Sequence, residues 1–358
     1  MLSLSDDELE RYSRQIVFSD IGYTGQIKLR DAKVCIIGVG GLGCPIATQL
    51  TAMGIGYLRL VDRDVVEQSN LHRQYLFDMK SLGYPKVEAA AKKLKNLNPN
   101  IKIEPVPMSL NVDNAVEIIK GVDIVIDGLD SMETRYAINR ACVKLKIPYI
   151  FGAAIMNYGN LSTIIPGETP CLECFFPDIK DETLPTCGTA GVHPSVLGIV
   201  SSLQVSEATR IIVGRKPHLI DKLLLVDLDK TSLQELVITR MENCPVCGIK
   251  PGKAPQPLER KFIEETCGRS GKRTFVIIPK ENLELNIKDL SKLLKKRETK
   301  ISVKADLGIT FLDDQKVTAS ILKSGVMIVK GLNGEKEAIK IYSDIIKDGL
   351  NIPWSRIN

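Results

Sequence analysis

Short apolar runs typical of buried strands alternate with longer stretches of helical periodicity over the first half of the chain. The predicted strands lie near residues 33–38, 57–62, 101–106 and 122–127. The predicted helices lie near residues 43–54, 85–97, 111–119 and 132–145. Because alternating strands and helices form parallel sheets, this order predicts an α/β fold with a doubly wound, mostly parallel sheet.

The pattern continues with strands near residues 150–156 and 160–165 and a mostly apolar helix near residues 196–213. That helix is expected to pack in a core or at a dimer interface. A proline-dense segment then predicts an extended linker over residues 251–259. We therefore predict one domain over residues 1–250, joined by this linker to a second unit.

Residues 260–358 show a different pattern of short strands and two helices. The strands are expected near residues 274–279, 301–304, 308–312, 316–321 and 325–330. The helices are expected near residues 287–296 and 334–347. This order predicts a small α+β domain of unknown role, and we favour protein docking or stabilisation over binding of RNA.

Composition adds little to this picture. The chain has 358 residues, 44% of them hydrophobic and 25% charged, which is typical of a soluble globular protein. No apolar run of membrane-spanning length is expected, so we predict a cytoplasmic protein without membrane contact. The net charge of +5 lies mostly after residue 250, and no aromatic-rich motif accompanies it, so nucleic acid is not an expected partner.

A glycine-rich turn follows the first predicted strand. Gly38 and Gly40 permit a sharp turn and close approach to an anion, and Gly43 lets the next helix pack on the strand. Asp62 ends the second strand, where a carboxylate can bind ribose hydroxyls. Dehydrogenases, flavoproteins and methyltransferases share such a turn, so the turn alone leaves the nucleotide open.

A polar segment after Asp62 favours a triphosphate. Two cations, Arg73 and Lys86, follow closely, together with the amides of Asn70 and Gln74. Cations and amides at this spacing can hold and polarise phosphoryl oxygens. The alternative, that both cations are ordinary solvated charges, does not explain their grouping.

The order of motifs resembles the ThiF/MoeB/HesA family, prokaryotic relatives of ubiquitin-activating enzymes, and within it the molybdopterin-synthase adenylyltransferase branch. The resemblance extends over about the first 250 residues. It includes the glycine turn and four cysteines. It also includes Arg11 to Ile16, Asp62-x-Asp64, Ser69-Asn70-Leu71-x-Arg73-Gln74, Gly83-x-Pro85-Lys86, and Asp127-x-x-Asp130 with Arg135.

The resemblance implies that a carboxylate attacks the α-phosphate of ATP and yields an acyl adenylate and pyrophosphate. Arg73 and Lys86 would bind phosphate oxygens, and Asp130 would hold Mg²⁺. Asp64 and Gln74 rank lower, because each could instead orient a neighbour or cap a helix. The expected nucleotide-binding residues are Gly38, Gly40, Gly41, Gly43, Asp62, Asp64, Ser69, Asn70, Arg73, Gln74, Lys86, Asp130 and Ser131.

Arg14 lies far upstream of the first predicted strand, where a surface helix charge is the ordinary interpretation. The resemblance implies instead that this arginine reaches the ATP phosphates of the partner subunit. We therefore expect a homodimer with Arg14 among its catalytic residues.

Two Cys-x-x-Cys pairs, Cys171/Cys174 and Cys244/Cys247, predict a closed tetrahedral Zn²⁺ site of structural character. Redox pairs or disulfides are disfavoured in a cytosolic protein.

Five further cysteines lie outside these pairs. Cys187, in a loop rich in glycine and threonine, is either an unreactive thiol or a covalent relay nucleophile, and the sequence does not decide between them. The remaining four are expected to be structural: Cys35, Cys44, Cys142 and Cys267.

These features lead to one hypothesis, ATP-dependent adenylation of the C-terminal glycine of a ubiquitin-like sulfur carrier or modifier that ends in Gly-Gly. A same-fold enzyme that activates a small-molecule or tRNA-attached carboxylate is the first alternative. A non-catalytic nucleotide-binding scaffold is the second, and an NAD-dependent oxidoreductase is a distant third.

Overall fold

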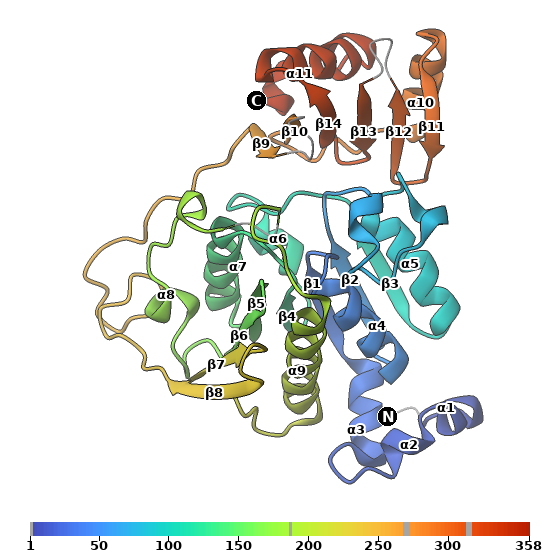
Figure 1. Ribbon diagram of the computed structural model, residues 1–358. Helices are drawn as coiled ribbons and strands as arrows, with labels where there is room; N and C mark the ends of the chain where they lie inside the picture. Colours follow the sequence, from blue (N-terminus) through green and yellow to red (C-terminus); the bar gives the residue numbers. More distant parts are fainter. Residues whose placement is uncertain (1–2, 186–187, 268–272, 313–316) are drawn as a thin grey trace.

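A computed structural model of the chain describes residues 3–185, 188–267, 273–312 and 317–358. Two β-sheets organise it, an eight-stranded main sheet within residues 33–237 and a six-stranded sheet within residues 263–332 (Figure 1). Two short helices, α1 (Asp6–Arg11) and α2 (Ser13–Ile16), precede the main sheet.

The main sheet has the strand order β3-β2-β1-β4-β5-β6-β7-β8. Its parallel part contains β1 (Lys33–Ile37), β2 (Tyr57–Val61), β3 (Lys102–Val106), β4 (Ile124–Asp127) and β5 (Tyr149–Ile155). Its antiparallel part contains β6 (Tyr158–Ile164), β7 (Lys222–Asp227) and β8 (Ser232–Val237). The predicted mostly parallel sheet is confirmed, whereas β7 and β8 were not predicted.

Helices cover both faces of the main sheet, as a doubly wound fold requires (Figure 1). One face carries α3 (Gly22–Asp31), α4 (Gly43–Met53), α5 (Lys86–Leu97) and α9 (Pro194–Val213). The other carries α6 (Ala115–Ile119), α7 (Met132–Leu145) and α8 (Leu172–Phe175). Alternate residues of β1 serve the two cores: Val34 and Ile36 face one, Cys35 and Ile37 the other.

Helix α9 is long and apolar enough to cross a membrane, judged by length and composition only. The sequence analysis expected no such run, and packing explains it. The helix contacts β5, β6, α3 and α4. Its Gln204 Nε2 donates to the carbonyl oxygen of Asp127 at 2.8 Å. Of the two predicted environments, a core or a dimer interface, these contacts show packing in the core.

Residues 260–358, here called the C-terminal region, form an antiparallel sheet of order β11-β12-β13-β14-β10-β9. Its strands are β9 (Ile263–Cys267), β10 (Arg273–Ile277), β11 (Lys300–Lys304), β12 (Gly308–Leu312), β13 (Thr318–Leu322) and β14 (Met327–Leu332). Helices α10 (Ile287–Lys296) and α11 (Glu335–Tyr342) cover one face, and the α+β architecture is confirmed. The helix predicted to reach residue 347 changes at Ser343–Gly349 to a π-helix, and α12 (Trp354–Ile357) ends the chain.

The other face of this sheet packs on the carboxyl edge of the main sheet (Figure 1). Val65, just after β2, is buried with Val276, Ile278, Leu322, Val326 and Ile328. Ser324 Oγ donates to the carbonyl oxygen of Pro107, just after β3, at 2.6 Å. The C-terminal region therefore lies over the edge where parallel strands present their ligands.

Candidate active site and metal centre

The glycine turn joins β1 to α4. Gly38 has a φ of 88°, in the left-handed region that favours glycine. A Cβ on Gly38 would lie 2.4 Å from the carbonyl oxygen of Gly128, and a Cβ on Gly43 would lie 1.9 Å from that of Gly38. The nearest atom to a Cβ on Gly40 is Nε2 of Gln74, at 3.9 Å. Gly38 and Gly43 thus pack the turn tightly, while Gly40 leaves room above it.

Asp62, at the end of β2, is fixed against this turn. Its Oδ2 accepts a hydrogen bond from the backbone N–H of Val39 at 2.7 Å, and its Oδ1 accepts one from Asp64 at 2.7 Å. Burial raises the pKa of Asp62, although Lys86 opposes the shift. A carboxylate has about four acceptor positions, so both oxygens keep capacity for the expected ribose contact.

Lys86, the first residue of α5, lies 2.9 Å from Oδ2 of Asp64. The lysine side chain is 7% exposed and the aspartate side chain 46%. Burial opposes the charge on Lys86, but the carboxylates of Asp64 and Asp62 raise its pKa above the ordinary value. The site therefore holds a permanently charged, nearly buried ammonium group beside the glycine turn.

The loop around Arg73 carries the other predicted polar residues. Arg73 Nη1 donates to the carbonyl oxygen of Ser69 at 2.9 Å, and Asn70 Oδ1 accepts from the backbone of Glu67 at 3.0 Å. Gln74 is buried, and its Oε1 has no hydrogen-bond partner among the residues that the structure describes. Because an unpaired buried polar atom costs about 1–3 kcal/mol, a polar ligand above the turn would stabilise this arrangement.

The two aspartates at the end of β4 and just after it differ completely. Asp127 is fully buried and accepts hydrogen bonds from Arg135 Nε at 3.0 Å, Tyr149 Oη at 2.7 Å and the backbone of Leu129 at 2.8 Å. Asp130 is exposed and lines a cavity of about 580 Å³. Only Asp130 is therefore available to a ligand, and its carboxylate suits Mg²⁺.

Ser131 lies beside Asp130 and begins α7 as its N-cap. Its Oγ accepts from the backbone of Thr134 at 3.3 Å and donates to Oδ2 of Asp181 at 3.1 Å. Asp181 also accepts from the backbones of Met132 at 2.6 Å and Glu133 at 3.0 Å. Both residues thus cap the helix, and Asp181 anchors the segment before residue 187 to the wall of the cavity.

Two predicted catalytic residues are not brought to this edge by the described part of the chain. Arg14 is exposed on α2, which lies at the end of the molecule opposite the C-terminal region (Figure 1). Cys187 lies outside the described residues. Arg14 therefore lies far from this edge of the sheet in its own chain.

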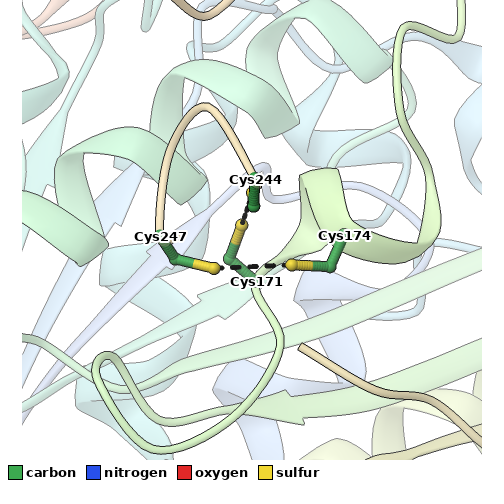
Figure 2. A group of neighbouring side chains, drawn as sticks. All are labelled: Cys171, Cys174, Cys244 and Cys247. Atoms are coloured by element: carbon green, nitrogen blue, oxygen red, sulfur yellow. Dashed lines mark hydrogen bonds between the residues drawn. The ribbon is translucent and has the colours of Figure 1, made fainter. Parts of the chain in front are cut away.

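The four predicted thiols meet in one buried cluster (Figure 2). Their sulfur atoms all lie within 4.8 Å of one another, with Cys171 and Cys244 at 3.7 Å and Cys174 and Cys247 at 3.4 Å. Tetrahedral Zn²⁺ with bonds of about 2.3 Å requires sulfur separations of about 3.8 Å. The cluster can therefore hold a metal ion of this type.

Three supporting residues of these sites were missed in the sequence. Arg63 lies between two predicted ligands, Asp62 and Asp64, and also lines the cavity. Gly248 follows the second cysteine pair, where a Cβ would lie 2.5 Å from the carbonyl oxygen of Cys244. Arg240 Nε donates to the carbonyl oxygen of Cys247 at 3.0 Å. A glycine directly after the Cys-x-x-Cys pair was the one local signal.

Comparison with known proteins gives a consistent family assignment. The Drosophila virilis protein named adenylyltransferase and sulfurtransferase MOCS3 is 37% identical over 300 residues, which cover 82% of this chain and 65% of that protein. The Aedes aegypti protein of the same name is 40% identical over 250 residues, 69% of this chain and 57% of that protein. This chain thus spans less than two thirds of the length of these relatives.

The Thermus thermophilus sulfur carrier protein adenylyltransferase is 39% identical over 270 residues, which cover 73% of this chain and 97% of that protein. The crystal structure of PaaA has a TM-score of 0.56 and 27% identity, covering 67% of this chain and 76% of that one. Escherichia coli MccB, with a TM-score of 0.61, 24% identity and coverage of 69% and 75%, shows the same fold. Residues 12–246 match the ThiF family, and because this match spans more than half of the chain, the protein belongs to that family.

Proposed function

We propose that the protein uses ATP to adenylate the C-terminal glycine of a small ubiquitin-like sulfur carrier or modifier. The observation that carries the proposal is the grouping of a buried lysine, a glycine turn and an available aspartate at one sheet edge. Lys86, Gly40 and Asp130 are its central members. The names of the Drosophila and Thermus relatives, which the comparison above gives, support this activity and this class of partner.

In this reaction a carboxylate oxygen bonds to the α-phosphorus of ATP as the bond to the bridging oxygen breaks and pyrophosphate leaves. Both reactants are anions, and two unit charges about 4 Å apart repel by about 4 kcal/mol at the effective dielectric constant of a protein surface. Lys86 and Arg73 would offset this repulsion by binding phosphate oxygens. Asp130 would hold Mg²⁺, which supplies further neutralisation of the phosphates.

We propose that Cys171, Cys174, Cys244 and Cys247 hold a structural Zn²⁺ ion. The donor set of four thiols fits that ion, and a site without an open ligand position does not take part in chemistry. We also propose a cytoplasmic homodimer in which Arg14 of one subunit serves the site of the other. The position of α2 at the far end of the molecule supports this arrangement (Figure 1).

ATP:pyrophosphate exchange tests the proposed activity. Purified protein is assayed with and without candidate ubiquitin-like proteins that end in Gly-Gly, and with the same proteins lacking the last glycine. Asp130→Ala and Lys86→Met are expected to lower exchange at least about 100-fold. Glu281→Gln is the matched control. The Glu281 carboxylate lies 2.8 Å from Nε of Arg356, and Glu281 does not line the cavity that contains Asp130.

Exchange that requires an intact Gly-Gly end and is lost in both variants supports the proposal. Exchange without any carrier protein favours a small-molecule carboxylate substrate. The absence of exchange with every carrier contradicts an adenylating function and favours a nucleotide-binding scaffold.

A further inference from the structure

The C-terminal region closes one side of the cavity that contains Asp130. The main-sheet side is formed by Asp130, Phe151, Ala153 and Ala154 among others. The opposite side is formed by residues 258–261, just before β9, and by residues 263–265 on it. These wall residues lie outside the segment 12–246 that matches the ThiF family. The cavity is therefore built partly from a segment that the family match does not include.

This docking does not depend on the linker alone. Glu88 of α5 accepts backbone hydrogen bonds from Asp306 at 3.1 Å and Leu307 at 2.7 Å. Thr310 Oγ1 donates to the carbonyl oxygen of Gly83 at 2.7 Å, and Lys330 pairs with Glu67 at 2.5 Å. Together with the buried cluster around Val65, these contacts fix the C-terminal sheet over the site.

One ion pair ties the cavity wall to the segment directly after β2. Arg63 Nη2 lies 2.6 Å from Oε2 of Glu264 on β9, and its Nη1 donates to Ser109 Oγ at 3.1 Å. The two charged side chains are 28% and 30% exposed. Burial opposes the charge on Arg63, but Glu264 raises its pKa. Glu264 therefore holds β9 next to the predicted ligands Asp62 and Asp64.

A second contact ties the start of the wall to α7. Lys261 Nζ lies 3.4 Å from Glu133 and 3.8 Å from Glu182. Glu133 is in the first turn of α7, directly after Asp130 and Ser131. The wall is thus tied to two residues that line the same cavity as Asp130, namely Arg63 and Glu133.

We infer that β9 and the segment before it form the outer wall of the channel for the carrier tail, and that Lys261 and Glu264 determine how tightly the tail binds. This inference rests on the proposed function. Among the described strands β9 pairs only with β10, so it is the edge strand of its sheet. An extended glycine-ended peptide fits beside such an edge, because its backbone can pair with the strand. The small side chains of Ala153 and Ala154 leave room on the facing side.

Exchange kinetics with increasing carrier concentration test this inference in the full-length protein. Glu264→Gln and Lys261→Gln are each expected to raise the carrier KM at least about fivefold, with kcat and the ATP KM changed less than about twofold. Lys261 is half-exposed, so its variant is expected to fold normally. The matched controls are Glu281→Gln and Lys292→Gln, which change the same charges elsewhere in the C-terminal region.

An unchanged carrier KM in both test variants would overturn the inference while leaving the proposed function intact. A rise in the ATP KM alone would also overturn it, because the wall would then serve the nucleotide. If the wild-type protein shows no carrier-dependent exchange, the proposed function fails and the inference fails with it.

Discussion

The carboxyl edge of the main sheet with Asp62, Lys86 and Asp130, here called the polar edge, differs from the cysteine cluster in how its side chains are paired and buried. At the polar edge, charged groups pair with one another and one member stays accessible, as Asp64 does beside the buried Lys86. In the cluster, four buried thiols come together, and all of their sulfur atoms lie within 4.8 Å of one another. The comparison teaches that accessible, incompletely satisfied groups indicate chemistry, whereas a closed, buried set indicates stability.

Loss of one cluster ligand should produce the largest effect. Cys244→Ser is expected to remove bound Zn²⁺ and to lower the free energy of unfolding by more than about 4 kcal/mol. The reason is that three buried ligands are left without the ion that holds them together. Metal analysis and thermal unfolding measure the two quantities.

Cys142→Ala is the control for this experiment, because Cys142 is equally buried but lies outside the cluster. It is expected to keep about one Zn²⁺ per chain and to lose about 1 kcal/mol. Equal metal content in wild type and Cys244→Ser would refute the closed-site interpretation.

Asp127, the last residue of β4, and Asp130, just after the strand, provide the next test. Asp127→Asn leaves the Arg135 guanidinium buried without its counter-charge and is expected to lower the free energy of unfolding by about 3 kcal/mol. Asp130→Asn should leave stability unchanged, because Asp130 is exposed. Denaturant unfolding measures the stability of both variants. A destabilised Asp130→Asn would contradict the conclusion that Asp127 supports the fold whereas Asp130 is available to a ligand.

Two glycines of the turn after β1, Gly43 and Gly40, are expected to respond differently to an added Cβ. Gly43→Ala forces a Cβ to within 1.9 Å of a carbonyl oxygen and is expected to cost about 2 kcal/mol of stability. Gly40→Ala meets no such obstacle, so it should fold normally yet weaken ATP binding by filling space above the turn. Calorimetric unfolding and ATP titration separate these effects. Normal ATP affinity in Gly40→Ala would argue against a nucleotide at that place.

The smallest expected effect concerns thiols that belong to neither site. Burial raises the pKa of Cys35 and Cys44 to about 12. At pH 8 only about one such thiol in 10,000 is ionised, so both should react very slowly with iodoacetamide in the native protein. Raising the pH from 8 to 10 should speed labelling about 100-fold while the fold persists. Peptide mass spectrometry identifies the labelled cysteines, and fast labelling of Cys44 at pH 8 would show that the turn opens.

Local patterns in the sequence were sufficient to predict most of the strand and helix order. Apolar periodicity, the glycine turn and the Cys-x-x-Cys spacing each depend on residues close together in the chain. Strand β8 was missed because five of its six residues are exposed, so the strand has no buried face that an apolar pattern could indicate. The π-helix after Tyr342 was missed as well, since its residues continue a helical pattern.

Contacts between distant segments were beyond such reasoning. Arg63 and Glu264 are 201 residues apart, and nothing near either residue marks the other as its partner. The family resemblance singled out Asp130 as a ligand, but local sequence contained no sign that Asp127 is buried, since that depends on hydrogen bonds from Arg135 and Tyr149. Tertiary packing decides which member of a motif stays available.

The cysteine cluster also imposes an order of events during synthesis of the chain. Cys171 and Cys174 leave the ribosome 73 residues before their partners Cys244 and Cys247. Because a chain is synthesised at roughly 5–20 residues per second, the second cysteine pair is made about 4–15 s after the first. Helix α9 and strands β7 and β8 emerge within that interval, before the cluster can fasten them to the middle of the sheet. A newly made chain thus passes through a stage in which the parallel strands β1 to β5 are already synthesised and only two of the four cluster cysteines are present.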